Sequence, residues 1–348
     1  MTGGFLVLED GTLFEGRSVG ALGIAFGEAV FTTAMTGYQE IVTDPSYSEQ
    51  IVAFTAPMVG NYGVAPTRSE SARVHARAVL MRRAGGADWA RWLGAQGIVA
   101  LEDLDTRSLV LHLRSRGAMR AAAVAGAASV EAVLADVRAG VGMEGCALVA
   151  GVSTPKRYDV GRGGVPIAVL DYGCKHSILR RLAACGARAT VWPHDTGAET
   201  ILAMRPAGVL LSNGPGDPAA LSQEIGVVRD LMGRVPILGI CLGHQLLSLA
   251  AGLATFKLPF GHRGSNHPVL DLAGNRVLVT SQNHGFAVRG EGEAITHVSL
   301  YDGTVEGLAL PDERASSVQF HPEAGPGPHD AWPLIESWIE EVRYAEAA

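Results

Sequence analysis

The fold is decided by one stretch, PILGICLGHQ, at residues 236–245. An apolar run leads into a cysteine that is flanked by glycines, in the pattern Gly239-x-Cys241-x-Gly243. This order predicts a buried strand, a tight turn at the cysteine and a helix that begins at Leu242. Glycines let the backbone approach closely at such a turn, and the thiol projects from the end of the sheet. There the positive end of the helix dipole favours the thiolate.

Alternating strands and helices extend on both sides of this stretch. Strands are expected at 167–170, 188–192, 208–211 and 236–240, and helices at 177–184, at 242–251 and from Pro218 onward with Asp217 as its N-cap. Repeated strand–helix units predict an α/β domain over 165–348, with a doubly wound, mostly parallel sheet and helices on both faces. Binding sites in such sheets lie at the carboxyl ends of the strands, which is where Cys241 falls.

A separate domain is predicted before this one. Residues 151–164, GVSTPKRYDVGRGG, are polar and glycine-rich and are expected to form a linker. Residues 1–150 have a mixed texture that predicts an α+β N-terminal domain. Its expected elements are a hairpin around Asp10-Gly11, a strand at 51–55, a strand or a helix at 72–83, and helices at 106–115 and 130–138. The alanine-rich stretch 121–135 also suggests a helix.

Composition excludes several classes of protein. The chain has 348 residues, 47% of them apolar and 18% charged, which is typical of a globular protein. A net charge of −7 without a long run of one sign speaks against a nucleic-acid partner. We see no signal peptide and no apolar run of about 18 residues, so we expect a cytoplasmic protein that is not a membrane protein. The four cysteines form no C-x-x-C pair, so we expect free thiols and no metal site.

A thiolate that takes part in acyl transfer needs a proton carrier, and His321 is the best candidate. It lies in SVQFHPE, residues 317–323, where 318–320 is expected to be a strand and Pro322 ends its pairing. Glu323 can bend back to hold the imidazole as a third member of a triad. Taken alone, H-P-E is compatible with an ordinary loop. His244 is a rival base, three residues after the cysteine, although its ring is expected to pack beside the sheet.

Two polar segments could bind a substrate. LSNGPGDP at 211–218 follows a strand, and it reads either as a capped turn or as a source of backbone amides for an oxyanion hole. QNHGF at 282–286 is expected to be a loop between strands that could bind a small zwitterion. His262 and His267 are a conceivable metal pair, but no carboxylate accompanies them in the glycine-containing stretch around them.

Four motifs together resemble the class I (triad) glutamine amidotransferases. They are GICLGHQ at 239–245, SNGPGDP at 212–218, QNHGF at 282–286 and HPE at 321–323, and they span the C-terminal half. In the N-terminal half, GEAVFTTAMTGYQE at 27–40 and PMVGNYG at 57–63 are similar to the amino-terminal domain of carbamoyl-phosphate synthetase small subunits. Amidotransferase domains of other pathways lack that domain.

The resemblance implies a role for each matching residue. Cys241 would be the nucleophile, His321 the base and acid, and Glu323 the group that orients the imidazole. The backbone amides of Leu242 and Gly214 would bind the oxyanion. The other residues implied to hold glutamine are Ser46 from the N-terminal domain, and Gly216, Gln245, Asn283, Gly285 and Phe286.

The resemblance also implies a partner. The chain has no G-x-x-x-x-G-K-[ST] loop, and nothing in it looks like a nucleotide-binding synthetase. A large synthetase subunit is therefore expected to use ATP, Mg²⁺ and bicarbonate, with the ammonia made here, for carbamoyl phosphate in arginine and pyrimidine synthesis. No cofactor is expected in this chain.

Three other functions stay open. The chain could be an amidotransferase subunit for another synthetase, although its N-terminal domain argues against this. It could be a catalytically silent, glutamine-sensing subunit, although that would not require a nucleophile at a strand–helix turn. A cysteine peptidase or another hydrolase on the same sheet is the third possibility.

Overall fold

The computed structural model describes residues 3–347, and its chain forms two compact units. The first unit holds residues up to Glu144 together with Pro259–Gly264, and the second holds Gly145–Leu258 and the chain from Ser265 onward. The segment 151–164, predicted as a linker, lies within the second unit. There Tyr158–Val160 forms the edge strand β8, which pairs with a neighbouring strand despite its polar sequence.

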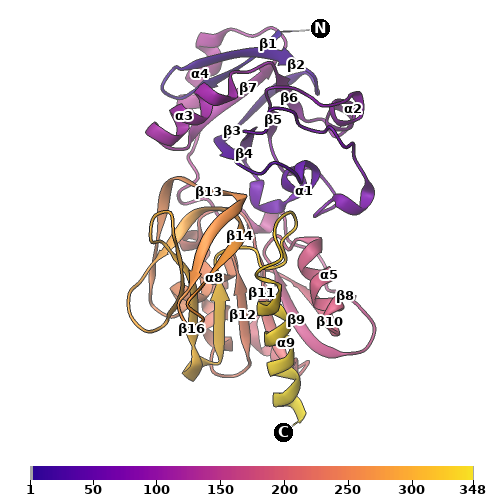
Figure 1. The fold of residues 1–348 in the computed structure, drawn as a ribbon, viewed down its shortest axis with the longest axis vertical. Helices are drawn as coiled ribbons and strands as arrows, with labels where there is room; N and C mark the ends of the chain where they lie inside the picture. Colours follow the sequence, from indigo (N-terminus) through magenta and orange to yellow (C-terminus); the bar gives the residue numbers. More distant parts are fainter. Residues whose placement is uncertain (1–2, 348) are drawn as a thin grey trace. The chain divides into compact units, whose positions relative to one another are not determined.

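The first unit is built on a closed seven-stranded barrel in the order β1-β2-β6-β5-β4-β3-β7 (Figure 1). The predicted hairpin is confirmed, because β1 and β2 pair antiparallel on either side of Asp10-Gly11. The strand predicted at 51–55 is confirmed as β4, and the ambiguous stretch 72–83 contains β5. The bounds are β1 Gly3–Leu8, β2 Leu13–Ser18, β3 Gly23–Thr32, β4 Gln50–Phe54, β5 Ala78–Leu80, β6 Val99–Glu102 and β7 Met119–Ala125.

The helix expected from the alanine-rich stretch 121–135 is wrong in its first part. Residues 119–125 form β7, which pairs with β1 and β3 to close the barrel. Alternate alanines point to opposite faces of the strand: Ala121 and Ala123 fill the barrel interior, and Ala122 lies beneath helix α4. Small side chains permit this close packing on both faces, and strand pairing across the barrel outweighs the helix preference of alanine.

Helices and short turns cover the barrel. The helices predicted at 106–115 and 130–138 are confirmed as α3 and α4. The elements are α1 Tyr38–Thr43, α2 Ala87–Ala95, α3 Thr106–Arg116 and α4 Val130–Ala139, with 3-10 turns η1 Pro45–Tyr47 and η2 Pro66–Arg68.

The second unit holds a ten-stranded mixed sheet in the order β14-β13-β15-β16-β17-β12-β11-β9-β10-β8. Its centre, from β10 through β9, β11 and β12 to β17, is parallel, whereas the pairings beyond β17 are antiparallel. The bounds are β8 Tyr158–Val160, β9 Val165–Asp171, β10 Ala187–Pro193, β11 Gly208–Leu211, β12 Ile237–Ile240, β13 Ala254–Asp271, β14 Arg276–Arg289, β15 Ile295–Ser299, β16 Val305–Leu310 and β17 Ala315–Val318. The predicted doubly wound sheet is confirmed in this parallel centre.

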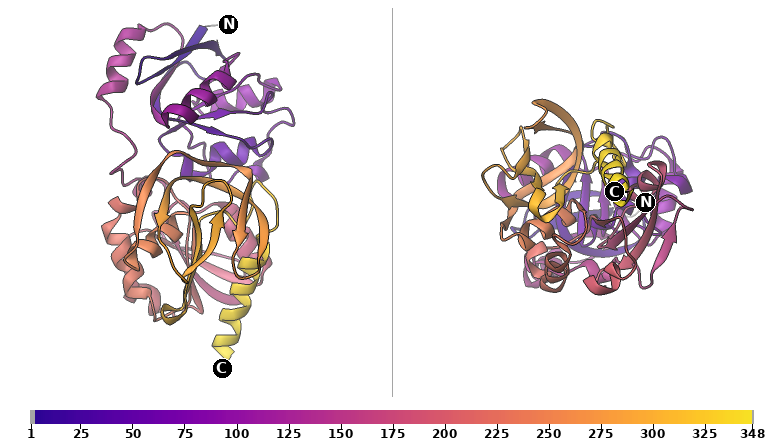
Figure 2. Two further views of the ribbon diagram at one scale, coloured as in Figure 1. Left: turned by 60° about the vertical axis from the view of Figure 1, so that its left-hand side comes forward. Right: turned by 90° about the horizontal axis from the view of Figure 1, so that it is seen from below.

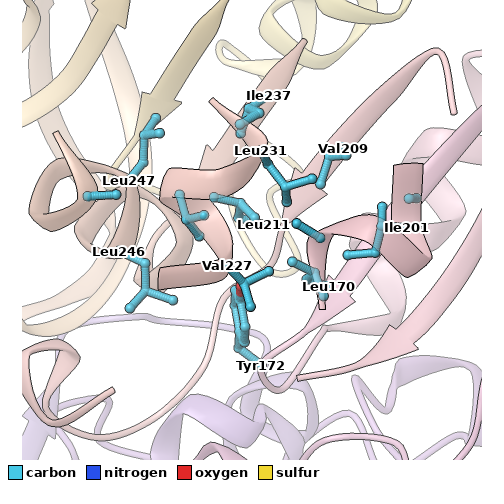
Figure 3. Close-up of a cluster of buried hydrophobic side chains, with 14 of the residues drawn as sticks. Leu170, Tyr172, Ile201, Val209, Leu211, Val227, Leu231, Ile237, Leu246 and Leu247 are labelled. Carbon is cyan, nitrogen blue, oxygen red and sulfur yellow. The ribbon is translucent and has the colours of Figure 1, made fainter. Parts of the chain in front are cut away.

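Helices lie on both faces of the parallel centre. Successive residues of β11 face opposite sides: Leu211 packs with α7 and α8 in the cluster drawn in Figure 3, and Leu210 packs with α5 and α9 on the other face. Figure 2 shows α9, in yellow, running beside the strands of this unit. The helices are α5 His176–Ala184, α6 Ala198–Leu202, α7 Ser222–Leu231, α8 Leu242–Ala250 and α9 Trp332–Ala347, with 3-10 turns η3 Val149–Gly151, η4 Pro218–Ala220 and η5 Pro311–Glu313.

Three local predictions in this unit are corrected. The segment 282–286 is not a loop, because β14 runs through it and buries its polar side chains. The helix expected from Pro218 starts later: Pro218–Ala220 is a 3-10 turn, which Asp217 caps, and the α-helix α7 begins at Ser222. The strand expected at 318–320 ends at Val318, where its ladder with β12 ends. Among residues 3–347, no helix is long and apolar enough to cross a bilayer.

Candidate functional site

The chain turns sharply between β12 and α8, and Cys241 occupies the turn. Its backbone has φ 55° and ψ −104°, a strained conformation for a residue with a side chain. The flanking glycines make the turn possible: a methyl group on Gly239 would lie 2.7 Å from the Gly243 carbonyl oxygen, and one on Gly243 only 2.2 Å from the Leu211 carbonyl oxygen. The turn is therefore a nucleophile elbow, as the sequence predicts.

The thiol of Cys241 is buried but has polar neighbours. Its Sγ donates to the backbone carbonyl oxygen of Asn283 at 3.7 Å, and its side chain is close enough to His321 to raise the pKa of that ring. The backbone amide of Leu242, the first residue of α8, has no acceptor within its own helix. The next amide, that of Gly243, donates to the Ser212 carbonyl oxygen. The sequence thus places a thiol beside a helix amide that is available to an oxyanion.

His321 and Glu323 form a buried pair at the same edge of the sheet. Nδ1 of His321 lies 2.7 Å from Oε1 of Glu323, and both side chains are almost completely inaccessible to solvent. Hydrogen bonds hold both ends of this loop. The His321 backbone amide donates to the Ser281 carbonyl oxygen, and the Trp332 indole donates to the Glu323 carbonyl oxygen. The geometry leaves Nε2 of His321 on the side of the ring away from Glu323, toward the thiol.

Lys175 is a member of this cluster that sequence reasoning missed. Its Nζ lies 2.8 Å from Oε1 of Glu323, and its side chain is 3% exposed. It follows β9, whose carboxyl end lies at the same sheet edge as that of β12, and its amide donates to Oδ1 of Asn213. A lysine in the turn that follows a buried strand, here residues 171–175, indicates a nearby carboxylate, because a buried ammonium group without a partner is strongly destabilising.

Opposing effects determine the ionisation of this cluster. Burial raises the pKa of Glu323, but the charges of Lys175 and His321 outweigh it and hold that pKa well below its usual range. Burial lowers the pKa of His321, and the charge of Lys175 lowers it further. The Glu323 carboxylate and the neighbouring Cys241 side chain raise it by more, so the net shift is upward. At neutral pH the imidazole is therefore protonated, and a protonated ring of this kind can act as a general acid.

The loop after β11 lies against this sheet edge. A methyl group on Gly214 would lie 2.2 Å from the Tyr172 carbonyl oxygen, so the loop can approach only with glycine at this position. Gly216 has φ 96°, and a methyl group there would lie 2.5 Å from the Cys146 carbonyl oxygen. Asp217 fixes the far end of the loop, because its amide donates to that same carbonyl oxygen.

The remaining glutamine ligands implied by the resemblance lie in two places. In the second unit, Nε2 of Gln245 donates to the Phe286 carbonyl oxygen at 2.9 Å. Asn283, Gly285 and Phe286 all lie on β14, and the Asn283 carbonyl oxygen accepts from Cys241. Ser46 lies in the first unit, in η1, where its amide donates to Asp44. The contribution of each of these residues to glutamine binding stays a prediction.

Other candidates lie apart from this chemistry. Nδ1 of His244 pairs with the Ser317 hydroxyl at 2.8 Å, and burial lowers the pKa of His244 to about 3, as in a packed core histidine. None of the four cysteines, all of which lie in the described part of the chain, is recorded in a disulfide. Cys146, Cys174 and Cys185 are half-buried and none of them lies at a strand–helix turn of this kind.

Comparison with known proteins places both halves of the chain. The family model described as glutamine amidotransferase class-I matches residues 168–340, and that described as carbamoyl-phosphate synthase small chain, CPSase domain, matches residues 6–123. The chain is 46% identical to the carbamoyl phosphate synthase small chain of Thioalkalivibrio sulfidiphilus, over 98% of each protein. It belongs to the carbamoyl phosphate synthase small chain family.

Further relatives agree with this assignment. The carbamoyl phosphate synthase small chain of Chlorobaculum tepidum is 46% identical over 96% of both chains. That of Escherichia coli (strain K12) is 45% identical, over 97% of this chain and 96% of its own. The C-terminal unit, with its cysteine turn, is the class I glutamine amidotransferase domain, and the barrel unit is the small-chain domain. The alternative of an amidotransferase for a different synthetase is thereby set aside.

Proposed function

We propose that this chain hydrolyses glutamine to glutamate and ammonia through a glutamyl thioester, and that the ammonia passes to a large synthetase chain. The observation that supports this most directly is the strained Cys241 turn beside the buried His321–Glu323 pair, at the carboxyl ends of β12 and β17. Binding of glutamine without chemistry would require neither the strain at Cys241 nor an ionised imidazole beside it.

The first half of the reaction forms the thioester. The Cys241 thiolate attacks the carboxamide carbon of glutamine, and the amides of Leu242 and Gly214 hold the resulting oxyanion. The His321 imidazolium gives its proton to the amide nitrogen as the carbon–nitrogen bond breaks, so ammonia leaves as a neutral molecule. Glu323 stabilises the charged ring and holds its orientation.

The second half releases glutamate. Neutral His321 takes a proton from water, which attacks the thioester carbon, and collapse of this second intermediate expels the Cys241 thiolate. The imidazolium and the thiolate are then restored. We propose that Ser46, Gly216, Gln245, Asn283, Gly285 and Phe286 hold the glutamine head group through these steps.

The partner follows from the chemistry of the product. We propose that the large chain uses ATP, Mg²⁺ and bicarbonate, and that this chain carries no cofactor, since its nucleophile, acid and oxyanion donors are all protein groups. Free ammonia would be protonated in neutral water and lose its nucleophilicity, so a protected route between the chains is expected. The cytoplasm, which supplies ATP and bicarbonate, is the compartment that we propose.

The test is Cys241→Ala in the complex with the large chain. We expect glutamine-dependent carbamoyl phosphate synthesis to fall by at least about 10²-fold while synthesis from added ammonia survives. Cys185→Ala is the matched control, because Cys185 is a half-buried thiol at the end of α5 and should be dispensable. Retention of glutaminase activity by Cys241→Ala would contradict the proposal.

A further inference from the structure

The carboxamide of Gln245 is held by a second buried carboxamide, that of Gln319. We propose that Gln319 is a positioning residue that fixes the orientation of Gln245, so that its carbonyl oxygen is presented to the α-ammonium group of free glutamine. This inference rests on the proposed function, since it concerns recognition of the same substrate. It makes Gln319 a determinant of specificity for the free amino acid.

Gln319 is anchored independently of Gln245. It directly follows β17, its side chain is completely buried, and its backbone amide donates to the Glu306 carbonyl oxygen at 2.9 Å. Its Oε1 accepts a hydrogen bond of 3.0 Å from Nε2 of Gln245. It also precedes His321 by two residues, so it connects the segment that carries the base with the helix that follows the nucleophile.

The direction of these hydrogen bonds is set by a backbone carbonyl. The Phe286 carbonyl oxygen can only accept, and it faces the Gln245 carboxamide at 2.9 Å, so the NH₂ group of Gln245 must point toward it. The same NH₂ group then requires an acceptor from Gln319. Turning either carboxamide over would bring two donors or two acceptors together, so the network has a single favourable arrangement.

This arrangement leaves the carbonyl oxygen of Gln245 for a ligand. Both hydrogen bonds of the carboxamide within the described chain are donated by its Nε2. Gln245 lies in the first turn of α8, and its backbone amide donates to the Cys241 carbonyl oxygen, so the two residues are one helical turn apart. An acceptor that is fixed in this position matches an ammonium group and disfavours an acylated α-nitrogen or a peptide.

The choice of glutamine at position 319 supports this role. Among the residues that the structure describes, Nε2 of Gln319 is buried and has no hydrogen-bond partner. A buried unpaired amide destabilises a protein, because its desolvation is not compensated by a hydrogen bond. A residue that served only to fill the space would be apolar, so the feature that requires glutamine here is its oxygen, which is the atom that contacts Gln245.

Two substitutions of similar size separate the role of the side-chain oxygen of Gln319 from that of its side-chain nitrogen. In the complex with the large chain, Gln319→Met removes the acceptor, whereas Gln319→Glu keeps an oxygen at the same position and replaces only the unpaired amide. A carboxyl group buried there is kept neutral by desolvation. We expect Gln319→Met to raise the KM for glutamine about tenfold with kcat nearly unchanged, and Gln319→Glu to stay within about threefold of the natural chain.

A second measurement tests the ammonium group directly. The probe is the glutamine analogue with a hydroxyl in place of the α-amino group. The natural chain should discriminate against it in kcat/KM by more than about tenfold, and Gln319→Met should lose most of this discrimination. If Gln319→Met does not fold, the natural chain and Gln319→Glu are compared on glutamine and on the analogue. The inference requires the two chains to discriminate between these substrates to the same extent, and a difference would overturn it.

The possible outcomes are distinct. An unchanged KM in folded Gln319→Met, a Gln319→Glu variant as impaired as Gln319→Met, or a natural chain that accepts both substrates equally would each overturn the inference. A natural complex that hydrolyses no glutamine at all would instead overturn the proposed function. Ammonia-dependent synthesis, measured in each preparation, confirms that the complex itself is intact.

Discussion

Nζ of Lys175 lies 2.8 Å from Oε1 of Glu323, the same carboxylate oxygen that pairs with Nδ1 of His321. A single oxygen of Glu323 therefore contacts both the buried ammonium group of Lys175 and the imidazole of His321. Because all three side chains are almost completely buried, their charges interact with little screening by solvent. Lys175 and His321 both favour the ionised form of Glu323, and Glu323 in turn keeps His321 protonated.

This arrangement predicts that two substitutions shift the His321 pKa in opposite directions. Glu323→Gln removes the carboxylate that raises the pKa of His321, so the pKa should fall. Lys175→Met removes a positive charge that opposes protonation, so the pKa should rise. Both changes can be measured from the imidazole resonances during an NMR pH titration.

His75 provides an internal control for that titration. It lies in the barrel unit, where burial lowers its pKa to about 4, and neither substitution should change this value. Shifts of His321 in the same direction in both variants would contradict the charge arrangement. Lys175→Met should also lower the free energy of unfolding, by up to about 3–5 kcal/mol, because it removes one of the two cationic partners of a buried carboxylate.

The same pair predicts a pH dependence of stability. The lowered pKa of Glu323 stabilises the fold above the ordinary value of 4.5, and this contribution is lost as the pH falls through the folded-state pKa. The raised pKa of His321 stabilises the fold fully below 6.5, and this contribution is lost as the pH rises through its folded-state pKa. Both contributions are therefore present together between 4.5 and 6.5.

Urea unfolding of the natural chain and of Glu323→Gln, across this range and above it, tests the sign. The difference in unfolding free energy between the two chains should be largest between pH 4.5 and 6.5 and should shrink above it. A difference that grows steadily from pH 6.5 to 9 would show that the carboxylate does not stabilise a charged imidazole.

The glycine at position 243 should be irreplaceable for a steric reason. A methyl group there would lie 2.2 Å from the Leu211 carbonyl oxygen, a backbone atom that cannot move aside without distorting β11. We expect Gly243→Ala to shift the Cys241 turn and reduce glutaminase activity by about 10²-fold, since displacements of about 1 Å have effects of this size.

Gly226→Ala is the matched control for this substitution. Gly226 lies within α7, and a methyl group there would meet nothing within 4 Å. This change should leave activity intact and stabilise the chain by up to about 1 kcal/mol, because alanine favours helix. Equal activity of the two variants in a steady-state glutaminase assay would rule out the steric account of the cysteine turn.

Local sequence patterns were sufficient for the parallel centre of the second unit but not for its edges. The strand–turn–helix at Cys241 has short-range causes, namely an apolar run, flanking glycines and a helix start, and these are visible in ten residues. The 282–286 segment resembled a loop because its side chains are polar. Strand β14 runs through it because those side chains find partners elsewhere, as Gln282 does with Glu306 at 2.9 Å. Such pairings join distant positions and leave no local periodicity.

The same limitation explains why the sequence did not predict strand β7 of the barrel or the buried contact of Lys175. Alanines in β7 read as helix formers because propensity is local, whereas closure of the barrel depends on pairing with β1, more than a hundred residues earlier in the chain. Lys175 is 148 positions from Glu323, so only the sheet topology brings them together. His321 and Glu323 could be paired in advance because they are neighbours in the sequence.

The last prediction concerns how the 213–217 loop is held in place. Asp217 accepts from the Ala219 amide through Oδ1, which caps η4, and from the Gly145 amide through Oδ2 at 2.8 Å. Gly145 begins the second unit, and the amide of Asp217 donates in return to the Cys146 carbonyl oxygen. The segment 145–146 thus holds the loop that carries Gly214, one of the proposed oxyanion donors.

Asn and Ala substitutions of Asp217 separate its role as the cap of η4 from its contact with the Gly145 amide. Asp217→Asn keeps an oxygen for the cap but turns an amide toward the Gly145 amide. Only the side-chain contact with Gly145 is lost, and the backbone contact with Cys146 remains. We expect a fall in kcat of about three- to tenfold, corresponding to a weakened oxyanion contact, with the melting temperature little changed because Gly145 is exposed. Asp217→Ala should show this kinetic loss and a further loss of about 1 kcal/mol in stability from the missing cap. If Asp217→Asn retains the natural kcat, the contact between the Asp217 side chain and the Gly145 amide has no part in catalysis.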